Sequence, residues 1–460
     1  MGKGLTGIRS LQRKQEPMGS IGQLLPTTLR GIANKARTDS RHRFRSLYGL
    51  VNEQALLSTW TFLNKQATAG VDRVTVHEYA SNLKENIAGL VRRLKQKRYR
   101  ARLVRRRNIP KGDGTGRLRP LGIPVVEDRL LQLTVARILG AIFEPVFLPC
   151  SYAYRPGVGA QQAVSDLTQE LQFGCYGYIV DVDIKSYFDM IDHDKLMAIL
   201  EERIDDRPFL RLIRKWLKAG VLEEDGKVLH PETGSPQGGC ISPVLANIYL
   251  HFAVDKWFVE EVKPRCAPRA YMIRYADDIV FAFQYKKDAD KFFRVLPKRL
   301  GRYGLELSVE KSRILRFKRF KLGKEAESFE FLGFEFRWIV DRKGVPRVKR
   351  RTSPKRARLS LARLTEWAKR QRTRPVQEVM RTFSDKLRGY YNYYGVRGNA
   401  ASLWTYHKAA LKILHKWLNR RSQSRSYGWR GFYALVEHFR VPRPRITEYR
   451  DRQMELSYAP

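Results

Sequence analysis

Acidic residues are scarce in this sequence. Its 460 residues include 46 Asp and Glu against 88 Lys and Arg, which gives a net charge of +42. A field of that sign attracts polyanions, so nucleic acid is the expected partner and a membrane surface is the weaker alternative. The hydrophobic share of 43% is large enough for a globular core, which excludes a disordered basic tail.

Cysteine is also rare, and long apolar runs are missing. The four cysteines, Cys150, Cys175, Cys240 and Cys266, include no close pair. Their spacing excludes a disulfide framework or a zinc site and is typical of reduced thiols in the cytoplasm. No apolar run approaches the roughly 18–20 residues of a membrane-spanning helix, and the basic N-terminus lacks the apolar segment of a signal peptide. We therefore expect a cytoplasmic protein.

Hydrophobic spacing predicts helices in the first part of the chain and a mixed order after it. Residues 41–100 and 125–175 carry apolar residues at helical intervals, whereas 99–124 form a basic, β-like segment broken by a Gly-rich turn. From 176 to 340 short apolar strands alternate with helices, which predicts an α+β fold with an antiparallel sheet backed by helices. The expected strands are Tyr178–Ile184, Met272–Tyr275, Ile279–Phe283 and Phe329–Phe336, and the expected helices lie near Lys195–Leu222 and Pro243–Glu261.

The segment from 341 to 380 shifts sharply toward basic residues, with 14 Lys and Arg against 3 Asp and Glu. Ser353 and Pro354 form a helix start signal, with Ser as the cap and Pro at the first position. Three amphipathic helices with basic outer faces are expected after it, and they make a small bundle. A solvated helix face is the plain interpretation of these charges, but their single sign favours a groove for a polyanion.

Two adjacent acids interrupt an apolar run in RYADDIV, residues 274–280. Taken alone, Asp277 and Asp278 indicate a turn, because Asp is common in turns. Between two apolar strands, however, two carboxylates repel each other unless a cation lies between them. A hard divalent ion with oxygen ligands resolves this conflict, and Mg²⁺ prefers a few carboxylates together with phosphate oxygens.

A third carboxylate is available in YIVDVDIKSYFD, residues 178–189. Strand alternation places Asp181 and Asp183 on one face, so spacing alone does not choose between them. Two Mg²⁺ ions held by such acids would bind the attacking 3′-oxygen and the leaving pyrophosphate. Basic residues between Arg105 and Arg129 are candidates for the triphosphate. The Gly-rich GSPQGGCISP, residues 234–243, is either a tight loop before a core helix or a backbone that approaches a nucleotide.

These motifs, in this order, resemble those of group II intron reverse transcriptases, the intron-encoded maturases. RYADDIV is similar to the family's Tyr-x-Asp-Asp box, DIKSYFDMIDH (183–193) to its first carboxylate motif, and GSPQGGCISP to the motif between them. Further similar segments are IPKGDGTGRLRPLGIPVVEDR (109–129) in the fingertip, SYAYRPGVGAQQAV (151–164) after it, ESFEFLGFEF (327–336) after the palm, and TAGVDRVT (68–75) in the N-terminal extension.

The resemblance implies a role for particular residues. It selects Asp183 as the first metal ligand, joined by Asp277 and Asp278, for two Mg²⁺ ions or alternatively Mn²⁺. Phe188 matches the bulky residue under the sugar that leaves no room for a ribose 2′-OH; an ordinary core aromatic is the alternative. The other implied contacts are Lys111, Arg119, Arg129 and Gln237 for the incoming nucleotide and template, and Tyr275, Ala276 and Gly238 for the primer and template.

The resemblance also implies a right-hand polymerase. Its expected parts are an N-terminal extension (1–98), fingers (99–175), a palm with the carboxylates (176–340), an α-helical thumb or maturase domain (341–440) and a tail (441–460). In the thumb, Tyr391, Tyr394 and Trp429 either stack on bases or lie in the core. The implied partners are group II intron RNA or another RNA template, a DNA primer, target DNA and dNTPs, in the prokaryotic cytosol or at the nucleoid.

Three functions are compatible with these features. The leading one is an RNA-directed DNA polymerase, a nucleotidyltransferase, that also binds its intron RNA and promotes splicing and retromobility. A second is a host-adapted reverse transcriptase of phage defence, spacer acquisition or repair. A non-catalytic RNA-binding splicing factor is less expected, because all three acids are present. Since no cysteine follows Cys266, the Cys/His metal endonuclease of many relatives is expected to be missing.

Overall fold

The computed structural model describes residues 27–110, 116–235, 238–266, 269–319, 327–421 and 426–448. The chain forms two compact units. We call them the N-terminal unit (Met1–Val158 and Val180–Ile314) and the C-terminal unit (Gly159–Ile179 and Leu315–Pro460). These units divide the chain at other positions than the five expected domains, and the domain boundaries therefore stay a prediction.

Helices dominate the first part of the N-terminal unit. They are α2 (Thr27–Thr38), α3 (Glu53–Trp60), α4 (Val76–Ser81) and α5 (Leu83–Lys95). The local sequence explains where α4 begins. The Thr75 hydroxyl accepts the Glu78 N–H at 3.2 Å, and the Glu78 carboxylate accepts the Thr75 N–H at 2.7 Å. This reciprocal pair is a capping box, which satisfies two donors that a helix start leaves unbonded.

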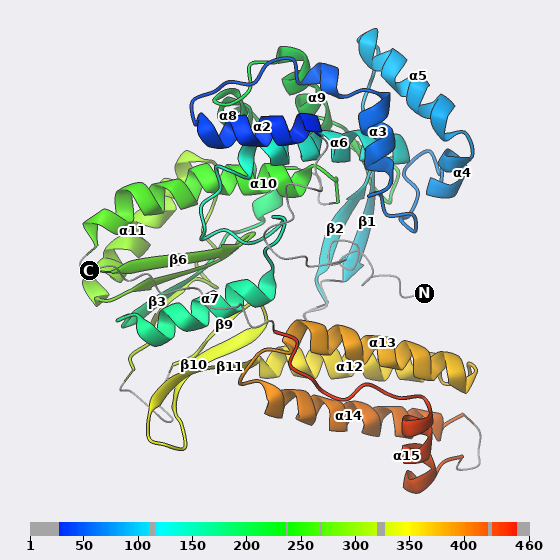
Figure 1. Ribbon diagram of the computed structural model, residues 1–460, viewed down its shortest axis with the longest axis vertical. Helices are drawn as coiled ribbons and strands as arrows, with labels where there is room; N and C mark the ends of the chain where they lie inside the picture. Colours follow the sequence, from blue (N-terminus) through cyan, green and yellow to red (C-terminus); the bar gives the residue numbers. More distant parts are fainter. Residues whose placement is uncertain are drawn as a thin grey trace. The chain divides into compact units, whose positions relative to one another are not determined.

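A basic hairpin follows these helices. Strands β1 (Val104–Pro110) and β2 (Leu118–Ile123) pair antiparallel, from Arg105 opposite Ile123 to Pro110 opposite Leu118. Two short strands, β4 (Val221–Leu222) and β5 (Val228–Leu229), complete a sheet of order β2-β1-β4-β5. Helix α6 (Val126–Phe143) follows β2 and is buried on nearly every side, including its polar residues Asp128, Arg129 and Gln132. Helix α2 packs along it (Figure 1).

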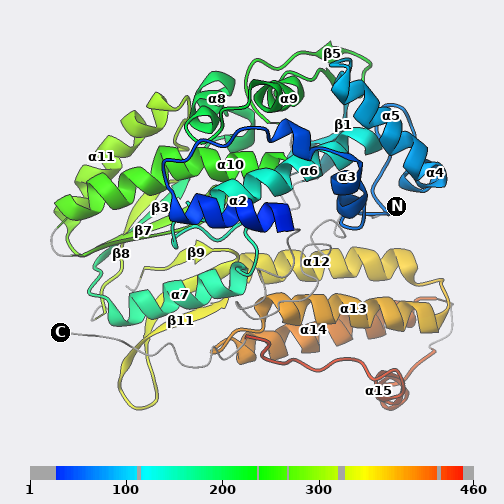
Figure 2. The same cartoon turned by 45° about the horizontal axis from the view of Figure 1, so that its top comes forward.

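A second sheet carries the acidic motifs. Its strands are β3 (Tyr178–Asp183), β6 (Ala270–Tyr275), β7 (Asp278–Phe283) and β8 (Arg313–Arg316), in the order β6-β7-β3-β8. β6 and β7 form an antiparallel hairpin. Helices α10 (Ser242–Leu250) and α11 (Lys286–Arg302) lie on one side of this hairpin (Figures 1 and 2). The Phe292 ring of α11 packs against Phe281 and Phe283, with centroids 4.5 and 5.1 Å apart. The predicted antiparallel strands backed by helices are thus present.

The two long helices expected in this region are interrupted. Helices α8 (His193–Glu201) and α9 (Arg207–Leu217) replace one helix at 195–222, because the Asp206 carboxylate accepts the Phe209 N–H at 3.0 Å and starts a new helix. Helix α10 ends at Leu250, and the chain continues as π-helical turns over His251–Asp255 and Phe258–Val262. Short 3₁₀ turns occur at Tyr48–Leu50, Tyr187–Asp189 and Lys263–Arg265.

In the C-terminal unit, the single strand expected at 329–336 is two strands. β9 (Phe329–Phe331) and β10 (Phe334–Val340) are separated by Leu332 and Gly333, whose φ angles of 52° and 77° reverse the chain. β10 then pairs with β11 (Pro346–Thr352) to give the order β11-β10-β9.

Helix α7 (Ala160–Phe173) lies along this sheet (Figure 2). Its Gln172 side chain binds the free edge of β11, accepting the Val348 N–H at 2.7 Å and donating to the Pro346 carbonyl at 3.2 Å. The edge strand is thus covered rather than left open to pair with another chain.

The rest of the C-terminal unit is a helical bundle. Its helices are α12 (Pro354–Gln371), α13 (Val376–Tyr394), α14 (Ala400–Leu418) and α15 (Trp429–His438). Helix α12 begins at the predicted Pro354, but the Ser353 hydroxyl donates to a Glu330 carboxylate oxygen at 2.5 Å and does not cap the helix. None of the described helices is long and apolar enough to cross a membrane.

Candidate active site

The acidic motif forms the turn of the β6–β7 hairpin. Tyr275 lies opposite Asp278 in the last pair of the ladder, so Ala276 and Asp277 make the two-residue turn. Ala276 has a φ of 56°, in the left-handed region that residues with a β-carbon rarely adopt. Such a conformation persists only where the surroundings hold it. Arg274, two residues before Ala276, binds the carbonyl of that residue.

The Arg274 side chain is fully buried, and every N–H of its guanidinium has an acceptor. The five donors bind the Asp255 carboxylate twice (2.7 and 2.6 Å), the Asn247 side-chain oxygen (2.9 Å), the Ser151 hydroxyl (2.7 Å) and the Ala276 carbonyl (3.3 Å). A planar guanidinium suits such a site, because its donors are fixed in one plane. The strained turn is thus tied to the buried ion pair. A charged residue inside the apolar run AYMIRY is the signal that could have revealed it.

Asp183 ends strand β3 and is held by the segment before β8. Its N–H donates to the Ser312 hydroxyl at 3.1 Å, and its carbonyl accepts the Ser308 N–H at 2.8 Å. Its carboxylate forms an ion pair with Lys311 at 2.9 Å. Asp181 instead pairs with Arg313 at 3.8 Å. The two acids that sequence spacing left equivalent therefore have different partners.

Burial and neighbouring charges both act on Asp277. Burial raises the pKa of the Asp277 carboxyl, and repulsion from Asp183 raises it further, while Arg119 and Lys311 act in the opposite direction. Such an effect requires the four side chains to lie within electrostatic reach of one another. The structure therefore brings together Asp183 of β3, Asp277 of the hairpin turn and Arg119 of β2, three elements distant in sequence.

The carboxylates at the hairpin turn are candidate ligands for a metal ion. Across the part of the chain that the structure describes, no three Asp, Glu, His or Cys side chains are grouped as metal ligands. Asp183 and Asp277 nevertheless form a partly buried pair of like charges, and Asp183 is neutralised by the Lys311 ammonium. A divalent cation would relieve this repulsion with the oxygen ligands that Mg²⁺ prefers. In charge and donor type, the residues fit the ion.

Arg129 lies buried beside the Gly-rich loop and has unused donors. It is 6% exposed, and its Nε and one terminal nitrogen have no hydrogen-bond partner among the described residues. Burial lowers the pKa of the Arg129 guanidinium, while Cys240 and Asp72 raise it. A buried donor without an acceptor is costly unless a ligand supplies one. This geometry is compatible with the nucleotide or template contact expected of Arg129.

Gly238 brings the Gly-rich loop against strand β2. Its φ is 120°, and a β-carbon there would lie 2.3 Å from the Gly122 carbonyl oxygen. Only glycine allows this approach. The sequence left open a tight loop before a core helix or a backbone that approaches a nucleotide. The structure places Gly238 against β2, and the approach to a nucleotide stays a prediction. Lys111 and Gln237, which belong to the same expected site, lie outside the described residues.

Phe188 is packed next to the first carboxylate motif. It is 7% exposed, its ring lies 5.4 Å from that of Tyr187, and its carbonyl accepts the Ser235 N–H at 2.8 Å. The Tyr187 hydroxyl donates to the Ala246 carbonyl at 2.5 Å, which anchors this turn to α10. The position suits either a core aromatic or a wall beside the sugar, so the gate stays a prediction.

Tyr154 joins the site without having been singled out by sequence. Partial burial raises the pKa of the Tyr154 hydroxyl, although the residue as a whole is 46% exposed, and the neighbouring Asp277 and Tyr275 raise it further, while Arg119 lowers it. Burial likewise raises the pKa of Tyr275. Tyr154 has a φ of 57°, a strained value of the kind that gathers at functional sites. Its place in SYAYRPG was the only available signal.

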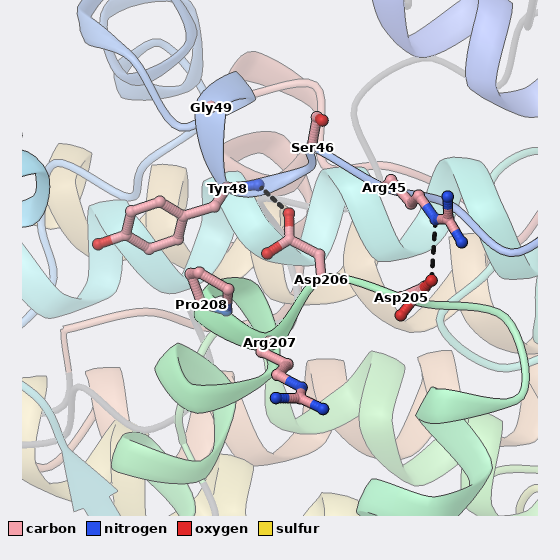
Figure 3. Close-up of a pocket in the computed structure, with 8 residues that line it drawn as sticks. All are labelled: Arg45, Ser46, Tyr48, Gly49, Asp205, Asp206, Arg207 and Pro208. Carbon is pink, nitrogen blue, oxygen red and sulfur yellow. Dashed lines mark hydrogen bonds and ion pairs between the residues drawn. The ribbon is translucent and has the colours of Figure 1, made fainter.

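A cleft elsewhere in the N-terminal unit is structural rather than part of this site (Figure 3). It lies where the segment before α3 packs on the start of α9. Asp206 accepts the Tyr48 N–H at 2.8 Å, and Arg45 pairs with Asp205 at 2.8 Å. Arg45, Asp205 and Asp206 thus already hold two chain segments together, whereas Arg207 is exposed.

Comparison with known proteins agrees with this geometry. Residues 109–336 match the family described as reverse transcriptase (RNA-dependent DNA polymerase). The group II intron-encoded protein LtrA of Lactococcus lactis subsp. cremoris is 40% identical over 176 residues, which are 38% of this chain and 28% of LtrA. Protein YkfC of Escherichia coli K12 is 30% identical over 372 residues, which cover 73% of this chain and 94% of YkfC.

A plant protein shows a weaker similarity. The mitochondrial nuclear intron maturase 4 of Arabidopsis thaliana is 27% identical over 130 residues, 28% of this chain and 16% of that protein. The match to LtrA also spans less than a third of LtrA, whereas the match to YkfC spans nearly all of it.

Proposed function

Because the chain belongs to the reverse transcriptase family, we propose that it is an RNA-directed DNA polymerase that extends a DNA primer on an RNA template with dNTPs. The observation that carries this proposal is that Asp183 ends β3 and Asp278 begins its neighbour β7, so that acids 95 residues apart in sequence (278 minus 183) come from adjacent strands of one sheet. An ordinary turn that contains an Asp does not need a further acid from a neighbouring strand. A polymerase site does, because both acids serve one cation-binding centre.

The three carboxylates are the proposed metal-binding groups. Asp183, Asp277 and Asp278 would hold Mg²⁺ or Mn²⁺, which, when bound, stabilises negative charge on the triphosphate and the attacking oxygen. Lys311 holds the Asp183 carboxylate in place through its ion pair at 2.9 Å. Arg274 fixes the turn that presents Asp277 and Asp278 through its bond to the Ala276 carbonyl.

Further residues are proposed to bind the nucleotide and the nucleic acid. Arg119 and Arg129, with Lys111 and Gln237, would contact the incoming nucleotide and the template, and the unbonded donors of Arg129 support this role. Phe188 would exclude a ribose 2′-OH by filling the space beneath the sugar. The proposed contacts with the primer and template are made by Tyr275, Ala276 and Gly238. The positions of Tyr275 and Ala276 at the β6–β7 hairpin, and of Gly238 against β2, support this role.

We further propose that the chain binds a group II intron RNA and promotes its splicing and retromobility. The printed names of LtrA and of nuclear intron maturase 4 associate those relatives with introns. In this chain the proposed RNA-binding part is the basic segment and helical bundle of 341–440, where residues 341–380 carry 14 Lys and Arg against 3 acids. Phosphate recognition by such a surface depends on charge.

Primer extension tests the polymerase. The purified chain should extend a DNA primer on an RNA template with dNTPs and Mg²⁺, and Asp277→Ala should abolish extension while RNA affinity stays within about twofold. Asp225→Ala removes an exposed carboxylate from the β4–β5 turn and is the matched control, expected to extend normally. Extension by Asp277→Ala at the rate of the control would refute the assignment of the catalytic site.

A further inference from the structure

Helix α11 presents a row of cations that the proposed active site does not use. The helix carries seven Lys and Arg and two Asp. Six of the cations are exposed, and five of these lie on one face of the helix: Lys287, Lys291, Arg294, Lys298 and Arg302, which we call the α11 row. At 3.6 residues per turn they fall within an arc of about 80° on the helix surface. The buried residues Ala289, Phe292, Leu296 and Leu300 occupy the opposite side.

The helix is held firmly against the rest of the N-terminal unit. Phe292 packs on Phe281 and Phe283 of β7. On the side, Arg299 donates to the carbonyls of Phe252 and Ala253 at 2.9 Å each. Arg299 is thus a cation of α11 that attaches the helix to its neighbours, and it does not belong to the α11 row. The row is therefore a preformed surface on a rigid element.

The α11 row has no acidic partner among the described residues, since no ion pair there involves any of its five side chains. Its members are spaced three or four residues apart, so that neighbouring like charges repel and destabilise the helix. A helix face that serves only solubility usually mixes both signs. A row of one sign indicates a polyanion that neutralises it.

Strand alternation places this row on the far side of the sheet from the catalytic acid. Along β7, residues 279, 281 and 283 face one side and 278, 280 and 282 the other. Phe281 and Phe283 contact α11, so the side chain of Asp278 points away from that helix. A nucleic acid bound along the α11 row is thus separate from a primer–template at the hairpin turn.

We propose that the α11 row is a second nucleic-acid surface, which binds the phosphate backbone of a folded, double-helical RNA while the active site holds its own substrate. From Lys287 to Arg302 the row covers 15 residue steps along the helix, about 22 Å at 1.5 Å per step. An A-form duplex exposes phosphates along a deep, narrow groove that is recognised by shape and charge rather than by base edges. The choice of RNA over DNA rests on the proposed function, in which an intron RNA is the partner. The proposal that the row binds a nucleic acid rests on its charge and position alone.

The test measures binding to an RNA duplex closed at both ends by loops, which has no 3′ end to occupy a polymerase site. We expect weaker salt dependence when three cations of the row are removed together, in the triple variant Lys291→Gln, Arg294→Gln, Lys298→Gln. The negative slope of log affinity against log salt should become shallower by roughly 3, about 1 for each lost phosphate contact. Each single change should make the slope shallower by about 1. If the triple variant fails to fold, the salt dependence of the single variants tests the proposal instead.

Two matched variants separate position from charge. Lys291→Arg, Arg294→Lys, Lys298→Arg keeps every charge and should bind as the original chain does. Arg207→Gln, Arg211→Gln, Lys218→Gln removes three exposed cations from α9 and its end, with the same change in net charge. It should leave the slope nearly unchanged. Equal losses in the α9 and α11 variants would overturn the proposal.

Two further measurements distinguish this surface from the polymerase site. The α11 triple variant should extend a short primer–template at the original rate; a parallel loss of extension would place the row in the polymerase site and overturn the inference. A closed DNA duplex should bind more weakly than the RNA, and tighter binding of DNA would refute the choice of RNA. If the original chain extends no primer at all, the proposed polymerase fails, and the closed-RNA result still decides the role of the row.

Discussion

At the scale of single residues, the candidate site depends on groups that sequence patterns do not reveal. The three acids and Arg119 were recognisable from their motifs. Arg274 was not, because its role comes from acceptors at positions 151, 247 and 255, and no local pattern shows that these meet. Tyr154 was missed for the same reason, since its proximity to Asp277 arises from the fold alone.

Replacing Arg274 should impair catalysis more than nucleotide binding. Arg274→Lys keeps a positive charge beside Asp255 but loses the fork that also reaches the Ala276 carbonyl. A displaced turn would shift the acids, and a shift of about 1 Å is enough for a loss of about 10²-fold in rate. Steady-state extension should therefore show a lower kcat and a nearly unchanged KM.

The control for this variant is Arg299→Lys. Arg299 also donates to buried carbonyls, but these belong to Phe252 and Ala253, away from the turn. It should lower thermal stability and leave kcat unchanged. If both lysine variants lose kcat equally, Arg274 has no special role in positioning the acids.

Asp128 should make stability depend on pH in an unusual direction. Burial raises the pKa of its carboxyl to about 6, although the Tyr99 hydroxyl at 2.7 Å and the Arg102 N–H at 3.0 Å bind it. Between pH 4 and 6 the folded state keeps this proton and the unfolded state does not. Raising the pH through this window therefore removes stability, by about 3 kcal/mol in all.

Asp128→Asn, which cannot titrate, isolates this contribution. Urea unfolding at several pH values gives the free energy of unfolding of both proteins. The value for the original chain should fall relative to that for the variant from pH 4 to pH 6 and then stay level. A difference that is constant with pH would show that the Asp128 pKa is ordinary in the folded protein.

At the scale of elements, apolar patterns located strands and helices, but not their interruptions. The strands around the acids were predicted to within two residues, because β-branched and aromatic runs bounded by acids are distinctive. The break at Asp206 and the change to π-helical turns after Leu250 arise from capping and packing, which outweigh helical periodicity. The turn between β9 and β10 needed Leu332 in a left-handed conformation, and leucine gives no sign of it.

Gly333 is the residue on which this turn depends. Its φ is 77°, and a β-carbon there would lie 2.9 Å from the Tyr394 hydroxyl. Gly333→Ala should therefore destabilise the C-terminal unit by about 1–3 kcal/mol, through backbone strain together with the clash. Thermal unfolding measures the loss.

Gly344→Ala is a matched control, because Gly344 has the same φ of 77° but nothing within 4 Å of an added β-carbon. Gly344→Ala should therefore lose stability only through backbone strain, without a steric clash. Adding Tyr394→Phe to Gly333→Ala removes the hydroxyl and should recover part of the difference. Equal losses at the two glycines would show that the approach of Tyr394 is unimportant.

At the scale of the whole molecule, the net charge of +42 favours association with a polyanion such as the proposed RNA partner. Composition alone predicted this partner class, because charge acts without reference to fold. Which surfaces bind is a matter of the fold. The α11 row, for example, could be identified only from the structure, which shows that the opposite side of its helix packs on Phe281 and Phe283.

Binding to RNA should be strongly salt-dependent. A complex with six or more phosphate contacts loses about 10³-fold or more in affinity between 50 and 200 mM salt, because displaced counterions return. Fluorescence anisotropy with a labelled RNA hairpin measures this loss. A peptide nucleic acid of the same sequence lacks the phosphates and should bind weakly with little response to salt. Similar behaviour of the two ligands would argue against electrostatic recognition.

The buried cluster around Arg274 also affects how the chain matures. Its members come from positions 151, 247, 255 and 274–276, so the cluster closes only after all of these have left the ribosome. A nascent chain that stops before Arg274 leaves Asp255 in an apolar helix without its counter-charge, which strongly disfavours the folded arrangement. Premature termination in this stretch should therefore yield fragments that aggregate or are degraded, and the hairpin bearing the two acids is completed only once its supports exist.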